Sequence, residues 1–258
     1  MINWQDKTRF TIGSTAFRCY DWVFGSQPST PQEYFLQKDA AMVKNYERVV
    51  QQLQPANIFE LGIWQGGSRV FFNELAKPEK LVAIELSEER IGAVDQYIAE
   101  QQLEDKLIPL YGVDQADSAT LKEIVEREFG GQPLDLIIDD ASHFISETRS
   151  SFNLLFPRLR PGGVFIIEDW SWAHDPVDNP KAAVNLYPER EPLSRLVFEI
   201  ILAAGSSRDL IESVEVNHYT VAVRRGQGAI ELEGFNIAEC SLERGRNMLA
   251  NHPSGEGN

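Results

Sequence analysis

Residues 134–143 read LDLIIDDASH, and residues 162–170 read GGVFIIEDW. Each segment is a short apolar run that ends in two adjacent carboxylates, and a histidine follows the first pair. Apolar runs of this length between helical patterns are typical of buried parallel strands. In open α/β sheets the carboxyl ends of such strands line the ligand crevice. We therefore expect four carboxylates and an imidazole to converge on one site, an arrangement that suits a hard metal ion beside a base.

The surrounding sequence alternates between strand and helix patterns from Asn57 onward. Strands are predicted at 57–61, 80–86, 106–111, 134–139 and 163–168. Helices are predicted between them, at about 67–76, 88–102, 117–129 and 146–157. This alternation predicts a parallel sheet with right-handed crossovers.

The alternation stops after Asp169. Residues 173–190 are rich in proline, aspartate and asparagine and predict a long loop, which a helix at about 192–204 follows. Residues 210–216 and 219–225 then alternate with period two across Asn217-His218, which predicts a hairpin and hence an antiparallel pair at the sheet edge. Residues 1–50 carry apolar residues at helical spacing, and Thr30-Pro31 resembles a helix start.

Composition excludes several classes of protein. The chain has 258 residues, enough for one large α/β domain, and 43% hydrophobic residues is ordinary for a globular protein. Its net charge is 24 − 39 = −15, with a pI near 4.7. This acidity argues against nucleic acid and against an anionic membrane surface as partners.

Cysteine content and the first residues bear on the compartment. Two cysteines, Cys19 and Cys240, are too few for a disulfide framework or a thiolate zinc site. The first residues show no basic region followed by an apolar stretch, so no signal peptide is expected. We expect two reduced cysteines and a cytoplasmic protein.

A glycine-rich turn follows the first predicted strand, where residues 58–68 read IFELGIWQGGS. Glycine lets the backbone approach a ligand closely, although tight strand–helix packing is the alternative explanation. The dinucleotide fingerprint G-x-G-x-x-G is absent, and the acidic residue Glu60 would repel pyrophosphate. That carboxylate suits a cationic ligand such as the amino group and sulfonium of S-adenosylmethionine.

Three further polar residues follow the neighbouring strands. Glu85 ends the second strand, where a carboxylate can accept both hydrogens of a ribose diol. Asp114 and Gln115, after the third strand, would lie beside the adenine, and a helix N-cap loop is an equally good explanation of them.

These motifs resemble class I S-adenosylmethionine-dependent methyltransferases, and more narrowly the metal-dependent macrolide-sugar O-methyltransferases of the mycinamicin type. The matching residues lie between Glu60 and Asp169: ELGIxxGGS at 60–68, Asp114-Gln115, IDDASH at 138–143, and LFPxLxPGGVFIIED at 155–169. Ala141 stands where the family usually has glycine, and neither the first 50 residues nor those after about 175 match clearly.

The resemblance implies a role for each matching residue. Asp140, Glu168 and Asp169 correspond to the ligands of Mg²⁺ or another hard divalent cation, and His143 to the general base. S-adenosylmethionine would be bound by residues of the glycine-rich turn and the following strand ends: Glu60, Gly62, Gly66, Gly67, Ser68, Glu85, Asp114, Gln115 and Asp139.

Reasoning from the residues alone leaves alternatives open. Strand alternation points Asp139 and Asp140 to opposite sides, so one of them is expected at the metal and the other at the cofactor. Either aspartate could instead be an ordinary polar residue at a strand end, and His143 could be a loop histidine or a helix cap.

The predicted fold is α/β, with a Rossmann-like, doubly wound, mostly parallel seven-stranded sheet, a C-terminal antiparallel hairpin and an N-terminal helical lid. The predicted domains are the lid segment 1–50, the methyltransferase domain 51–230 and a C-terminal extension 231–258. Residues 1–50 and the loop 173–190 are expected to form the lid and the substrate pocket.

The predicted activity is Mg²⁺-dependent methylation of a hydroxyl on a small molecule, with a sugar or polyol of a natural product as first choice. Alternatives are a catechol-like phenol as acceptor, a non-catalytic S-adenosylmethionine-binding protein, and a nicotinamide-dependent oxidoreductase. The sequence leaves open the acceptor's identity and whether the chain forms a homo-oligomer.

Overall fold

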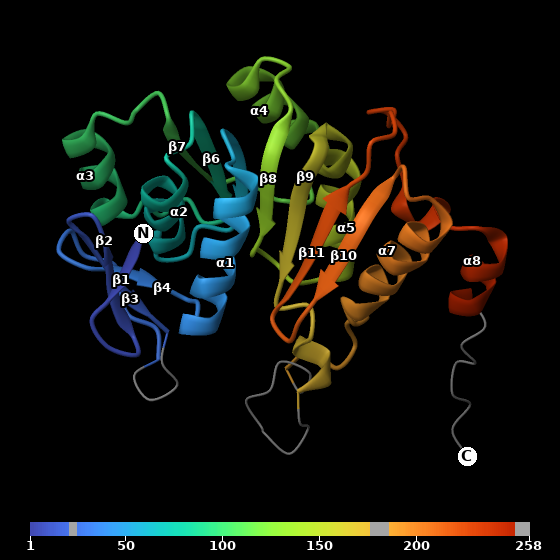
Figure 1. Cartoon of the computed structure of the whole chain (residues 1–258), viewed down its shortest axis with the longest axis horizontal. Helices are drawn as coiled ribbons and strands as arrows, with labels where there is room; N and C mark the ends of the chain where they lie inside the picture. The colour runs from blue at the N-terminus through green and yellow to red at the C-terminus, as the bar shows by residue number, and fades with distance from the viewer. Residues whose placement is uncertain (21–24, 176–185, 251–258) are drawn as a thin grey trace. The chain divides into compact units, whose positions relative to one another are not determined.

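The computed structural model describes residues 1–20, 25–175 and 186–250 (Figure 1). These residues group into two compact units, Met1–Ala141 and Ser142–Asn258. The structure assigns seven strands to the large sheet, in the order β8-β5-β6-β7 in the first unit and β9-β11-β10 in the second. Among the described residues, no helix is long and apolar enough to span a membrane.

The first unit contains the parallel strands of the large sheet. They are β5 (Asn57–Leu61), β6 (Lys80–Glu85), β7 (Leu107–Tyr111) and β8 (Leu134–Asp139). The helices α2 (Gly67–Ala76), α3 (Gly92–Gln101) and α4 (Ser118–Phe129) connect them. All three pairings are parallel, with β5 between β6 and β8. The predicted alternation is confirmed here, with element ends shifted by at most four residues.

The N-terminal segment differs from its prediction. Instead of helices, the described residues between 2 and 36 contain a second, four-stranded sheet of β1 (Ile2–Trp4), β2 (Arg9–Ile12), β3 (Thr15–Cys19) and β4 (Tyr34–Leu36). Thr30, the predicted helix start, lies in a tight turn bridged to Glu33. The helical expectation is correct only for α1 (Ala40–Leu53). The strands are three to five residues long, so their period-two burial pattern is short and easily mistaken for helical spacing.

The small sheet packs on α2 through aromatic side chains. Phe10 and Phe17 stack with ring centroids 5.1 Å apart, and both meet the ring of Phe71 edge-on at 6.0 Å. Figure 1 shows the strands of this sheet beside α1 and α2. The N-terminal residues therefore reach the helix that follows the glycine-rich turn.

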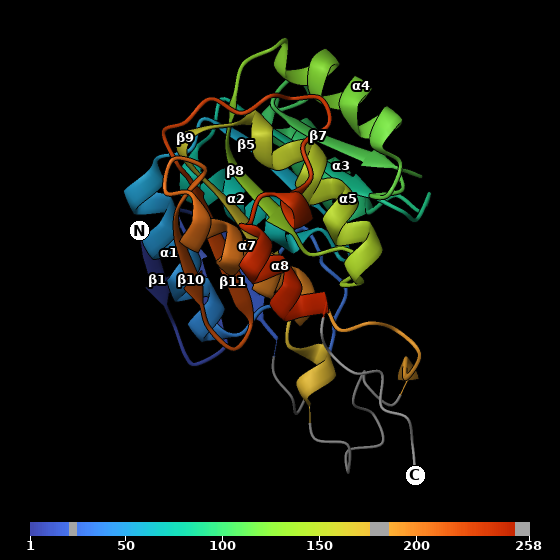
Figure 2. The ribbon, with the colours of Figure 1, turned by 90° about the vertical axis from the view of Figure 1, so that its right-hand side faces the viewer.

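The second unit is built around three antiparallel strands. It contains α5 (Ile145–Leu155), η1 (Phe156–Arg158), β9 (Leu159–Glu168), η2 (Trp172–His174), α7 (Ser194–Ser206), β10 (Ile211–Val216), β11 (Thr220–Arg225), η3 (Ile237–Glu239) and α8 (Glu243–Ala250). The predicted hairpin is present, and β11 pairs antiparallel with both β10 and β9. Figure 2 shows α8 beside α7, which it contacts.

A mixed α/β fold is therefore confirmed. The domain boundaries at 50 and 230 and the lid role of the N-terminal segment stay predictions. The predicted loop 173–190 begins with η2, and its residues 176–185 lie outside the described residues.

Candidate functional site

The glycine-rich turn joins β5 to α2 and is closely packed. Gly62 has φ +95°, and a side chain there would collide with the backbone carbonyl of Asp140. At Gly67 a side chain would collide with the carbonyl oxygen of Phe35 in β4. Close backbone approach therefore requires glycine at both positions even without a ligand.

A pocket opens at this turn, entirely within the first unit. Its lining combines the turn with the segment before α1 and the end of β8: Phe35, Gln37, Lys38, Gly62, Ile63, Trp64, Gln65, Gly66, Gly67, Ser68 and Asp140. Four of the predicted cofactor-binding residues, Gly62, Gly66, Gly67 and Ser68, thus share one pocket with the predicted metal ligand Asp140.

Glu60 does not line this pocket. Its side chain is fully buried in β5, and the nearest cation is Nη2 of the equally buried Arg69, 3.9 Å from Oε2. Neither carboxylate oxygen has a hydrogen-bond partner among the described residues, and the guanidinium nitrogens of Arg69 have none either. Burial raises the pKa of Glu60, an effect that Arg69 opposes, and burial lowers the pKa of Arg69.

Glu85 is held by the backbone of the glycine-rich turn. Its Oε2 accepts hydrogen bonds from the amides of Ile63 at 2.9 Å and Trp64 at 3.0 Å, and its Oε1 accepts one from Ser87 at 3.1 Å. Trp64 has φ +44° and is 63% exposed. The Glu85 carboxylate, which is expected to accept hydrogen bonds from a ribose diol, therefore also holds the glycine-rich turn in place.

The structure brings Gln115 and Asp139 together. The Gln115 amide donates to both carboxylate oxygens of Asp139, at 2.9 and 2.8 Å, and both side chains are buried. Asp114, in contrast, is exposed and accepts the backbone amide of Ala116 at 2.8 Å. This hydrogen bond is the kind expected if Asp114 belongs to a helix N-cap loop, which is the alternative explanation given above.

Lys38 is a site residue that the sequence did not indicate. Its ammonium lies 2.7 Å from Oδ2 of Asp140, and its side chain is 1% exposed whereas that of Asp140 is 24% exposed. The two residues are 102 positions apart, and no motif surrounds Lys38. A buried lysine carries no recognisable pattern in a single sequence.

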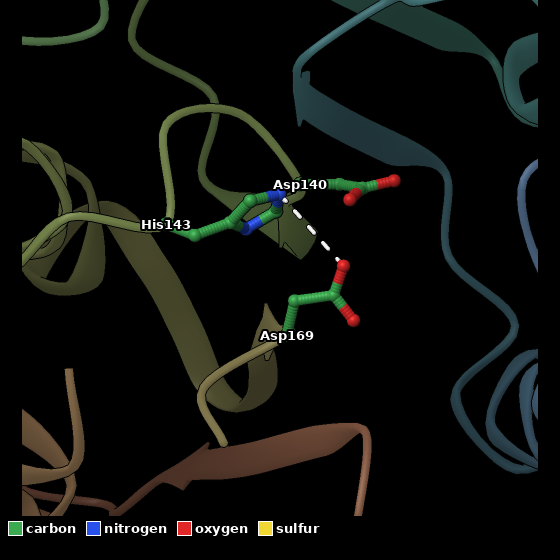
Figure 3. Close-up of side chains that lie close together, drawn as sticks. All are labelled: Asp140, His143 and Asp169. Atoms are coloured by element: carbon green, nitrogen blue, oxygen red, sulfur yellow. Dashed lines mark ion pairs between the residues drawn. The ribbon is translucent and has the colours of Figure 1, made fainter. Parts of the chain in front are cut away.

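His143 and Asp169 lie together in the second unit (Figure 3). Nε2 of His143 lies 3.8 Å from Oδ2 of Asp169, and the side chains are 28% and 53% exposed. Both residues have positive φ, +57° and +49°. The neighbouring Glu168 is 2% exposed at the end of β9.

The backbone around this pair is anchored by tryptophan. The indole N–H of Trp172 donates to the carbonyl oxygen of His143 at 2.9 Å, and its ring meets Phe144 edge-on at 6.2 Å. The amide of Asp169 donates to Tyr219 in the hairpin turn at 2.8 Å. Trp172 therefore helps to position the loop that carries His143.

Asp140 precedes His143 by three residues, so chain length alone keeps their Cα atoms within about 11 Å of each other. Asp140 thus belongs to the first unit and His143 to the second, and the two residues are close in sequence.

Comparison with known proteins finds a match for the central part of the chain. Residues 59–170, fewer than half of the chain, match the model of a methyltransferase domain. The match contains the glycine-rich turn and both acidic strand ends.

Two curated relatives are O-methyltransferases by name. Demethylmacrocin O-methyltransferase of Streptomyces fradiae is 32% identical over 130 residues, which cover 48% of this chain and 29% of that protein. Mycinamicin VI 2''-O-methyltransferase of Micromonospora griseorubida is 46% identical over 63 residues, which cover 24% of this chain and 15% of that protein. The matched part thus spans less than a third of either relative's length.

A solved structure supports the fold. The O-methyltransferase TomG of Streptomyces achromogenes, in complex with S-adenosylmethionine, has a TM-score of 0.51 at 20% identity and covers 74% of this chain and 82% of its own. Over residues 59–170 the chain therefore matches a methyltransferase domain, in agreement with what its motifs predict.

Proposed function

We propose that the protein is an S-adenosylmethionine-dependent, divalent-cation-dependent O-methyltransferase that acts on a hydroxyl of a small molecule. The observation that supports this best is the pocket in which the glycine-rich turn and Asp140 lie together, inside the segment that matches a methyltransferase domain.

The cofactor is assigned to the glycine-rich pocket of the first unit. Gly62, Gly66, Gly67 and Ser68 would contact the methionine part, and Glu85 would accept the ribose hydroxyls. Glu85 already accepts hydrogen bonds from two backbone amides of the glycine-rich turn. Ribose hydroxyls must therefore either share this carboxylate with the two amides or displace them from it. Gln115 and Asp139 would act as one unit, whereas Glu60, which is buried inside the protein, would act on the cofactor only indirectly.

The donor chemistry fits a hard divalent cation. Asp140, Glu168 and Asp169 offer carboxylate oxygens, and two of these side chains are partly or largely exposed. Oxygen ligands favour Mg²⁺, Ca²⁺ or Mn²⁺ over zinc. His143 is a further candidate ligand beside Asp169 (Figure 3). Such a cation would lower the pKa of a bound hydroxyl and fix its position.

Methyl transfer requires the acceptor hydroxyl to lose its proton as it attacks the sulfonium methyl carbon. His143 is partly exposed, and we propose that its Nε2 accepts this proton. Asp169, 3.8 Å away, would stabilise the imidazolium that results. Trp172 would hold the loop that presents the imidazole.

The acceptor proposed is a sugar or polyol hydroxyl of a natural product, which the names of two further relatives support: a rhamnosyl tetracenomycin-C 2'-O-methyltransferase and a rhamnosyl O-methyltransferase. The N-terminal segment is proposed to help form the acceptor pocket, because Phe35, Gln37 and Lys38 line the pocket at the turn.

The test is transfer of labelled methyl from S-adenosylmethionine to rhamnosyl-type glycosides and catechols in parallel, with EDTA and then with added Mg²⁺. We expect labelled glycoside, loss of transfer in EDTA and recovery with Mg²⁺. If only catechol became labelled, the proposed acceptor would be wrong and a phenol would take its place. Full transfer in EDTA would show that the reaction does not need a divalent cation. Calorimetry that detected NAD binding without S-adenosylmethionine binding would refute the methyltransferase assignment.

A further inference from the structure

The ion pair between Lys38 and Asp140 places a fixed positive charge on a carboxylate that the proposed function gives to a divalent cation. Burying an ammonium is costly unless a negative charge compensates it. Lys38 is 1% exposed and its Nζ lies 2.7 Å from Asp140 Oδ2. A cation that took Oδ2 would have to displace this ammonium, and one bound elsewhere on the carboxylate would feel its repulsion.

Both partners are held by their backbones. The carbonyl of Lys38 accepts the amide of Tyr20 at 3.0 Å, and the next residue, Asp39, caps α1 by accepting the amides of Ala41 and Met42. The amide of Asp140 donates to Leu61 at 2.9 Å. The pair is therefore built into the fold and is more than a chance contact of two long side chains.

The ring of Tyr46 fixes the other side of the ammonium. Nζ of Lys38 lies 5.7 Å from the ring centroid, and Tyr46 is fully buried in α1. A cation over an aromatic face is stabilised by the ring's quadrupole. Because Lys38 is almost fully buried and Asp140 is not, a ligand in the pocket would meet the carboxylate before the ammonium.

We propose that Lys38 is a built-in counter-ion of Asp140, which keeps this carboxylate ordered while no divalent cation is bound and weakens the binding of that cation. The inference rests on the proposed function because it takes Asp140 as a cation ligand. It makes Lys38 a positioning residue that acts through Asp140.

The test uses Mn²⁺ binding to the full chain, measured by calorimetry and by the thermal midpoint, for the wild type, Lys38→Met and Lys38→Gln. Removing the positive charge should tighten Mn²⁺ binding at least about tenfold, because like charges a few ångströms apart repel strongly in a partly buried site. Without Mn²⁺ both variants should melt below the wild type, and saturating Mn²⁺ should reduce this difference. A merely structural role for Lys38 would weaken Mn²⁺ binding instead.

Lys44→Met is the matched control, because Lys44 is an exposed lysine of the neighbouring helix that lies over the Trp4 ring, 5.5 Å from its centroid. It should bind Mn²⁺ like the wild type. Asp140→Asn should weaken Mn²⁺ binding and make it insensitive to Lys38→Met, since the two effects share one carboxylate.

The outcomes separate the two proposals. If Mn²⁺ binds the wild type and both Lys38 variants equally, or binds the variants more weakly, the role of Lys38 is wrong and the cation site stands. If Mn²⁺ binds none of the proteins, the cation in the proposed function is wrong, and the role of Lys38 falls with it. If Lys38→Met does not fold, Lys38→Gln, which keeps a donor for Asp140 without the charge, decides between these outcomes.

Discussion

The side-chain amide of Gln115 donates hydrogen bonds to both carboxylate oxygens of Asp139, at 2.9 and 2.8 Å. The two residues come from the loop after β7 and the end of β8, which are separated in the sheet by β5 and β6. This contact spans the carboxyl edge of the parallel strands. It therefore couples two positions that the sequence assigns to the cofactor independently.

Gln115→Ala should destabilise the protein by about 1–3 kcal/mol, since the buried Asp139 carboxylate loses a paired donor. We also expect weaker binding of S-adenosylhomocysteine, because Asp139 would no longer be held in place. Chemical denaturation and calorimetry measure the two effects. Gln96→Ala is the control, since Gln96 is exposed and contacts Glu100. Unchanged stability of Gln115→Ala would show that this contact does not hold the strand ends together.

The buried pair of Glu60 and Arg69 predicts a strongly non-additive mutant cycle. Arg69→Met or Glu60→Gln alone should each cost about 3–5 kcal/mol of unfolding free energy, because one buried polar group loses its compensating partner. The double variant should cost much less than the sum of the two. Arg127→Met, which removes a largely exposed arginine paired with Glu128, should change stability by less than about 1 kcal/mol. Additive effects in denaturant titrations would mean that the two side chains do not compensate each other.

The same pair predicts a pH dependence. Burial raises the pKa of Glu60 above its ordinary value of 4.5. The folded protein thus holds this proton more tightly than the unfolded chain does, so the stability contributed by the protonated carboxyl is complete below pH 4.5 and is lost as the pH rises through the folded pKa. Relative to Glu60→Gln/Arg69→Met, the wild type should lose stability as the pH rises from 4.5 toward neutrality. A constant or opposite difference in the thermal midpoint would contradict this.

The parallel part of the fold was predictable because each strand is a short, mostly apolar run with turn signals at its ends. Such a pattern specifies burial on both faces and needs no knowledge of distant residues. The small N-terminal sheet was not predictable in this way. Its strands are very short, and Phe10 and Phe17 both pack against Phe71, which lies in a helix more than 50 residues later.

The same distinction between local patterns and distant contacts applies to the candidate site. The glycine-rich turn and the acidic strand ends are local motifs, so the sequence marks them directly. The partners of these residues are not local: Lys38 reaches Asp140 across 102 positions. Equally, no local sequence pattern shows that Glu60 points into the protein whereas Glu85 points toward the glycine-rich turn. Their directions depend on which other elements pack against β5 and β6.

The last prediction separates the proposed base from its support. His143→Ala should lower turnover by about 10²–10⁴-fold, the range for removal of a general base, while S-adenosylhomocysteine binds as it does to the wild type. Trp172→Phe keeps an aromatic ring but removes the indole donor that binds the carbonyl of His143 at 2.9 Å. It should lower kcat less severely, because the imidazole remains but its loop is held less firmly.

Trp170→Phe is the matched control for that variant. Its indole donates to the carbonyl of Asn217 at 2.8 Å, in the hairpin turn, and not to the histidine loop. We expect kcat close to that of the wild type. Equal losses in the two tryptophan variants would mean that the whole loop after β9 matters and that the bond to His143 has no special role. Unchanged turnover of His143→Ala, with the cofactor still bound, would remove His143 from the mechanism and leave it as a candidate ligand beside Asp169.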